Sequence, residues 1–148
     1  MSRVLAPVLA AVLLASSTVI AQNAAPAARP PASPDYVFPA GSALLLFYVS
    51  RAHTADFEAV AARISQALDA SQDPARRQQA ASWRMFRSSD SASDAAVYVF
   101  LFDPVVPGAD YDPVRLLSES LPAEVQPLYE QLKASVIRVE RLALTKLR

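Results

Sequence analysis

Apolar residues recur along the chain with two different periods, and the change of period divides the chain into predicted strands and helices. Residues 43–49 form a short, continuous apolar run with aromatic and β-branched members, which is typical of a strand buried on both faces. Residues 95–102 give the strongest strand pattern, because their side chains alternate between two apolar sets. These sets are Tyr98, Phe100 and Phe102 on one face and Val97, Val99 and Leu101 on the other.

From Thr54 the apolar residues follow a helical period instead. The residues that share one stripe of this predicted helix are Phe57, Val60, Ala61, Ile64 and Leu68. Thr54 is a suitable N-cap, and the helix is expected to end before Asp73-Pro74. Two more helices are predicted, one after Asp112-Pro113 and one starting at Pro122. Pro127 should bend or interrupt the last of them, because it removes a backbone hydrogen bond.

The remaining pattern completes an α+β fold. Residues 75–81 could form a further helical turn, residues 82–87 alternate as a strand, and residues 88–94 are turn formers. The apolar stripe of the helix that starts at Pro122 consists of Val125, Leu128, Tyr129 and Leu132. Residues 136–147 are predicted to be the last strand, with Ile137 and Val139 on one face. The order β-α-β-β-α-β is the ferredoxin-like arrangement, in which helices cover one face of a four-stranded antiparallel sheet. The other face is left bare, and the aromatic side chains of residues 98, 100 and 102 are expected to need a cover there. A homodimer paired through this face is therefore predicted.

The N-terminal residues have the pattern of a secretory signal peptide. One basic residue precedes an apolar stretch, and Val19-Ile20-Ala21 fits a cleavage site. The prediction is a signal peptide over residues 1–21, an Ala/Pro-rich spacer over 22–41 and the α+β domain over 42–148. The location would be periplasmic or secreted, without stable membrane insertion. The competing interpretation is an uncleaved anchor, because 18 apolar or small residues from Val4 to Ala21 nearly span a bilayer.

The amino-acid composition excludes several kinds of binding site and reaction. The chain has no cysteine, which excludes disulfides, thiol catalysis and iron-sulfur clusters. Fourteen basic and fourteen acidic residues cancel, so no nucleic-acid partner is predicted. Two glycines leave little room for a glycine-rich phosphate loop. Asp110 and Asp112 fit no EF-hand spacing, and neither a metal nor a cofactor is predicted.

A few residues are candidates for a binding site. His53 is the only histidine and lies between the first strand and the first helix, where Asp56 or Asp103 could orient it. Residues on predicted strands could line a pocket for a flat apolar ligand between the sheet and the helices. They are Tyr48, Trp83, Arg84 and Tyr98. The competing interpretation is that these aromatic residues pack in the core or in a dimer interface, and that His53 is an ordinary residue beside the helix cap.

The order of elements over residues 42–147 resembles that of the dimeric α+β barrel superfamily, which includes small monooxygenases and haem-degrading enzymes. A block between residues 103 and 124 also looks like an uncharacterised family of exported bacterial proteins. The residues that carry this second likeness are Asp103-Pro104-Val105-Val106, Gly108, Asp110-Tyr111, Leu116-Leu117-Ser118-Glu119, Pro122 and Glu124. The first resemblance implies a dimer paired through its sheets, and the second implies no particular chemistry.

Three functions fit these observations. The leading hypothesis is an exported, non-catalytic module that binds a small molecule or a partner and acts as a homodimer. The first alternative is a small cofactor-independent or haem-linked oxidoreductase of the dimeric α+β barrel type, with His53 in the reaction. The second alternative is a structural protein of the cell envelope.

Overall fold

The fold is built on one four-stranded antiparallel sheet in the order β2-β3-β1-β4. The computed structural model describes residues 34–39, 41–89 and 94–147. The signal peptide predicted over residues 1–21 lies outside the described residues, as do residues 22–33 and 40 of the spacer predicted over 22–41. In chain order the elements are η1 (Pro34–Tyr36), β1 (Ser42–Ser50), η2 (Arg51–His53), α1 (Thr54–Asp69), α2 (Pro74–Ser82), β2 (Trp83–Arg87), β3 (Ala95–Phe102), α3 (Pro113–Ser120), α4 (Val125–Ser135) and β4 (Val136–Leu144).

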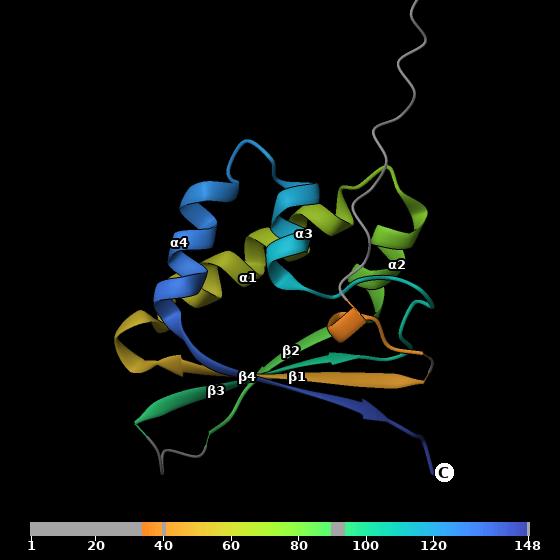
Figure 1. Cartoon of the computed structure of the whole chain (residues 1–148), viewed down its shortest axis with the longest axis horizontal. Coiled ribbons are helices and arrows are strands. Elements are labelled where there is room, and N and C mark those ends of the chain that lie inside the picture. The colour runs from red at the N-terminus through yellow and green to blue at the C-terminus, as the bar shows by residue number, and fades with distance from the viewer. Residues whose placement is uncertain (1–33, 40, 90–93, 148) are drawn as a thin grey trace, which may run out of the picture. The chain divides into compact units, whose positions relative to one another are not determined.

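This strand order confirms the predicted α+β class and ferredoxin-like topology. The two central strands are β1 and β3, and each is antiparallel to both of its neighbours. The helices α1 to α4 all lie on one side of the sheet (Figure 1). Within the described part of the chain, no helix is both long enough and apolar enough to cross a membrane.

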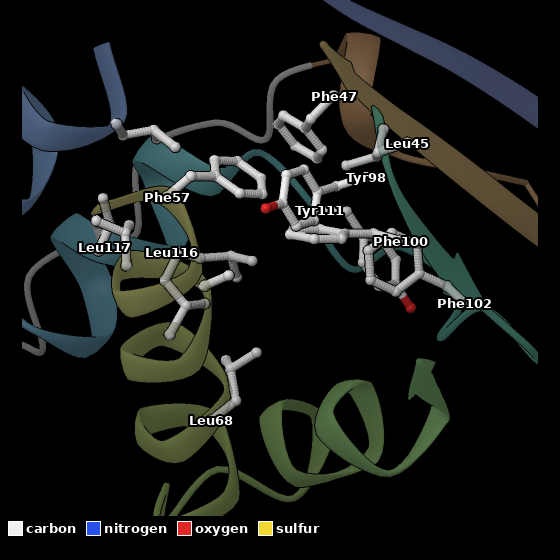
Figure 2. Close-up of a cluster of buried hydrophobic side chains, with 14 of the residues drawn as sticks. Leu45, Phe47, Phe57, Leu68, Tyr98, Phe100, Phe102, Tyr111, Leu116 and Leu117 are labelled. Carbon is white, nitrogen blue, oxygen red and sulfur yellow. The ribbon is translucent and has the colours of Figure 1, made fainter. Parts of the chain in front are cut away.

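The core lies between the sheet and helix α1. Phe57 of α1 contacts Phe47 of β1 and Tyr98 of β3, with ring centroids 5.2 and 4.8 Å apart. Figure 2 shows side chains from the two central strands and from α1 and α3 pointing toward one another. Tyr111, from the loop before α3, is also buried, and its ring centroid lies 4.3 Å from that of Phe102, with the two rings tilted by 45°. Burial of these rings is the main stabilisation of the fold, because each large aromatic side chain removes 150–250 Å² from water.

One sequence prediction about the sheet is wrong. The aromatic residues of β3 do not face outward, because Tyr98, Phe100 and Phe102 are at most 3% exposed beneath the helices. Among the described residues, no helix covers the opposite face of the two central strands (Figure 1). Its apolar residues are Leu44, Leu46 and Tyr48 of β1 and Val97, Val99 and Leu101 of β3, all of them partly exposed. A bare apolar face therefore exists as predicted, but it carries the other set of side chains.

The last strand also differs from the prediction, which placed Ile137 and Val139 on one face. Val136 pairs with Val49 while Arg138 pairs with Tyr48, so Ile137 is an extra residue in a β-bulge. The bulge leaves Ile137 65% exposed, whereas Val139 packs against the core. Strand β4 then ends at Leu144 rather than at Leu147.

Three helix boundaries differ from the predicted ones. Residues Pro74–Ser82, for which the sequence indicated at most a turn, form the complete helix α2, because the Asp73 side chain accepts a hydrogen bond from the Ala75 N–H at 2.8 Å. Helix α1 includes Thr54 as its first residue, so that the N-cap is His53. Helix α4 starts at Val125 and places Pro127 in its first turn, where no intrahelical hydrogen bond is lost and no bend is required.

Candidate functional site

The five predicted site residues do not line one pocket. Trp83 and Tyr98 lie on the helix side of the sheet, because Trp83 pairs with Phe102 and stacks on Phe100. Tyr48 and Arg84 lie on the opposite, uncovered face. His53 lies beyond the end of β1, in the short helix η2.

The two helix-side residues serve the core. The Tyr98 hydroxyl donates a hydrogen bond to Glu58 of α1, and the Arg87 guanidinium lies 5.7 Å from the Tyr98 ring centroid. Burial, followed by the hydrogen bond to Glu58, raises the pKa of Tyr98 to about 12. The indole N–H of Trp83 is buried and has no hydrogen-bond partner within the described residues. The interpretation that the aromatic residues pack in the core therefore applies to Trp83 and Tyr98.

The two residues on the uncovered face have different surroundings. The Arg138 guanidinium of β4 lies 3.8 Å from the ring centroid of Tyr48, in a cation-π contact. Arg138 also forms an ion pair with Glu140 at 3.1 Å. Arg84 is exposed at the margin of this face, on strand β2. These polar groups form part of a rim around the apolar side chains of the central strands.

The sequence suggested Asp56 or Asp103 as a partner of His53, and the structure places Asp56 beside it. Its Nδ1 atom lies 3.1 Å from Oδ2 of Asp56, and both side chains are nearly half exposed. Asp103 instead accepts a hydrogen bond from the Ser42 hydroxyl at 2.7 Å. An imidazole held by a carboxylate has the arrangement of a general base, but His53 is not among the residues that line the cavity described next.

A cavity of about 250 Å³ lies between α4 and the β1–β4 side of the sheet. Its wall is mostly apolar, with Phe47 and Val139 from the sheet and Leu132 from α4. The other lining residues are Tyr36, Asp112, Pro113, Val114, Tyr129, Lys133 and Val136. An apolar hollow with a few convergent polar groups is the usual form of a small-molecule site. We therefore take this cavity, here called the α4 pocket, as the candidate functional site.

Four polar side chains give the α4 pocket its chemistry. Asp112 accepts a hydrogen bond from the Val114 N–H at 2.9 Å and so caps α3. Partial burial raises the pKa of Asp112. Partial burial, and after it the Asp112 carboxylate, raises the pKa of Tyr36. On the α4 side, the Lys133 ammonium lies 6.0 Å from the ring centroid of Tyr129. The pocket thus combines two phenols, an acid and a cation.

A polar cluster buried between α2 and α3 was not expected from the sequence. Arg76 is 6% exposed and donates hydrogen bonds to Glu119 and, at 2.7 Å, to Gln79. The Gln79 amide donates to the Asp110 carbonyl at 3.0 Å, and Arg115 donates to Glu119 at 2.8 Å. Because these groups satisfy one another, we assign the cluster a structural role, which is to hold the loop before α3 against α2.

Within the described residues, no group of three or more histidine and carboxylate side chains is placed to hold a metal ion. A second hollow, of about 330 Å³, lies beside α2 and the loop after β3, but its wall is mostly small residues and proline. It offers fewer ionisable groups than the α4 pocket.

Sequence reasoning missed the residues of the α4 pocket. Tyr129 and Leu132 were assigned to the apolar stripe of a helix, and Lys133 was assigned no role. One signal was available, because the chain has only two lysines, Lys133 and Lys146, and the first adjoins that stripe. The contribution of Tyr36 had no local signal, since it lies far from α4 in the sequence.

Comparison with known proteins adds little to this description. The chain matches no protein-family model and no curated protein by sequence. A solved structure with a similar backbone is that of a mutant of SnoaB, a cofactor-independent oxygenase from Streptomyces nogalater. The two sequences are 16% identical, the match covers 72% of this chain and 93% of SnoaB, and the TM-score is 0.39. The fold assignment therefore rests on the strand order of the chain itself, and the resemblances to the two families stay predictions.

Proposed function

We propose that this chain is a small-molecule-binding module that acts as a homodimer. One observation carries the proposal. The helices α1 to α4 lie on one side of the sheet (Figure 1). The opposite side of the described sheet exposes an apolar surface, and the helix side retains the α4 pocket. The first surface suits a second copy of the chain, and the pocket suits a small ligand.

The dimer is favoured by the extent of the uncovered face. The apolar residues of β1 and β3 on this face are continued onto both edge strands by Phe86, which is 51% exposed, and by Leu142, which is 41% exposed. Water wets such a continuous apolar surface at a high free-energy cost, and surfaces of this kind usually mark an interface. Arg84, Arg138 and Glu140 supply the polar rim that is typical of interfaces.

The dimer is tested by the mass of the protein in solution. We expect light scattering at micromolar concentration to give twice the mass of one chain. Leu46→Arg places a charge at the centre of the uncovered face and should yield monomers, whereas Leu147→Arg, at a residue 90% exposed near the C-terminus, should remain dimeric. A wild-type protein that is monomeric at this concentration would overturn the dimer.

Ligand binding is tested by filling the α4 pocket. A neutral apolar probe such as toluene is expected to bind the wild-type protein and to shift the NMR signals of residues around Val139. Val139→Phe occupies the pocket and should abolish this binding. Ile137→Phe lies two residues away on the same strand, outside the pocket lining, and should leave binding unchanged. Equal binding to both variants would show that the probe uses another site.

A second candidate function is that of a small cofactor-independent or haem-linked oxidoreductase. The observation that favours it is the His53–Asp56 pair, with 3.1 Å between Nδ1 and Oδ2, in which a carboxylate can orient a partly exposed imidazole. Haem titration of the wild-type protein and of His53→Ala tests the haem-linked form. Identical spectra and affinities for the two proteins would remove His53 as a ligand.

We also propose that the protein is exported, on the basis of the apolar N-terminal stretch and the small residues that follow it. Mass spectrometry of the native N-terminus tests this proposal. A chain that begins at Gln22 would support cleavage of a signal peptide. A chain that retains residues 1–21 would instead support an anchor and the envelope structural alternative.

A further inference from the structure

We infer that the α4 pocket selects a small ligand that has an apolar body and one anionic group, and that Lys133 binds the anion. This inference rests on the proposed binding function and names the chemical class of the ligand. It is based on which charged side chains of the pocket lining already have partners within the protein.

Lys133 has no acidic partner among the residues that the structure describes. Within the described residues its ammonium forms no ion pair, and its one contact with a charged or aromatic group is to the Tyr129 ring, at 6.0 Å. Glu130, one turn earlier on the same helix, accepts a hydrogen bond from the Gln126 amide at 3.0 Å instead. Lys133 is exposed and lines an apolar pocket, so its ammonium is available to a ligand anion.

The other charge in the lining does not compete for the same role. The Asp112 carboxylate accepts hydrogen bonds from the backbone N–H groups of Val114 and Arg115 at the start of α3. It is thus committed to the helix cap, where the positive end of the helix dipole favours it. The hydroxyl groups of Tyr36 and Tyr129 can both donate hydrogen bonds to an oxygen of the ligand.

The size of the pocket limits the apolar body. A cavity of about 250 Å³ holds roughly eight atoms of water size, at about 30 Å³ each. One aromatic ring or a short branched chain with a carboxylate fills this space. The walls formed by Phe47, Leu132 and Val139 match such a body, because they offer apolar contact on several sides.

Calorimetric titration of the intact protein with toluene, benzoate and benzylamine tests the inference. The three probes share a ring and differ in charge. We expect benzoate to bind roughly fivefold more tightly than toluene, which is the gain in affinity that one partly exposed ion pair would give. Benzylamine should bind more weakly than either, because its charge repels Lys133. Lys133→Gln should remove the preference for benzoate over toluene. Lys146→Gln, which changes the other lysine, should behave as the wild type.

The possible outcomes separate this inference from the proposed function. If toluene binds but benzoate binds no better, or if Lys133→Gln leaves benzoate affinity unchanged, the role of Lys133 is wrong and the binding module stands. If no probe binds the wild-type protein, the pocket itself is not a ligand site, and both proposals are overturned. Toluene binding by Lys133→Gln also shows that this variant is folded.

Discussion

Tyr98 illustrates how one side chain serves two layers of the fold at once. Its ring belongs to the aromatic core, and its hydroxyl reaches Glu58 at the surface of α1. The hydroxyl therefore resists ionisation, and the pKa of Tyr98 is raised to about 12. Because the folded-state pKa lies above the unfolded value of 10.0, this residue contributes stability that is fully present below pH 10 and is lost as the pH rises toward 12.

Tyr98→Phe tests this contribution. We expect the variant to lose roughly 1 kcal/mol of unfolding free energy at pH 7, because it loses a hydrogen bond while Glu58 can still be hydrated. The difference from the wild type should shrink between pH 10 and pH 12. Urea denaturation at several pH values measures both effects, and a difference that is constant up to pH 12 would contradict the assignment.

Arg76 is the residue on which the buried polar cluster depends. Arg76→Ala removes its contacts with Glu119 and Gln79 and leaves those groups without their partner. We expect a loss of about 3 kcal/mol, at the low end for a broken buried ion pair, because Arg115 still contacts Glu119. The matched control is Arg77→Ala at the exposed neighbouring position, where less than about 1 kcal/mol should be lost. Equal losses in thermal or urea denaturation would show that burial of Arg76 is unimportant.

At the scale of single elements, the residue at which a helix begins is set by its N-cap as much as by its apolar stripe. Helix α2 has mostly polar residues, yet it is complete because Asp73 caps it and Pro74 occupies its first position. Helix α4 tolerates Pro127 because the helix starts late enough for the proline to lie in the first turn. Both features require knowledge of the starting residue, which an apolar stripe locates only to within a few residues.

Asp73→Ala is expected to destabilise the protein by about 1 kcal/mol, because the hydrogen bond to the Ala75 N–H is lost. Asp73→Asn retains a capping oxygen and should lose only a few tenths of this amount. Asp69→Ala removes an acid at the opposite end of a helix, the C-terminus of α1, where negative charge is unfavourable, and should be neutral or slightly stabilising. Urea denaturation of the three variants measures these differences.

At the scale of the whole molecule, the proposed dimer couples folding to association. If the uncovered face is buried only in the dimer, the melting temperature must rise with protein concentration. We expect a rise of about 3 °C for each tenfold increase, given the size of the paired domains. The Leu46→Arg variant should melt at a lower temperature that does not depend on concentration. A concentration-independent wild-type transition would indicate that each chain is stable alone.

Apart from α2, the sequence by itself determined the type and order of the helices and strands, because the periods of apolar residues and the short-range capping signals are local properties of the chain. It also showed that both faces of β3 are apolar, and hence that a bare face must remain. It did not determine which face α1 covers, since both sets of β3 side chains are apolar and the stripe of α1 could pack against either. That choice depends on the contacts of Phe57 with Phe47 and Tyr98.

The α4 pocket was decided only by the tertiary structure. Its lining comes from η1, β1, α3, α4 and β4, and these segments meet because the sheet places β4 beside β1 and the helices pack on one side. Lys133 shows the difference most clearly: the sequence places it beside a helical stripe, and only packing places it in the lining of a cavity. A cavity is the space left between packed elements, and no local pattern of residues encodes that space.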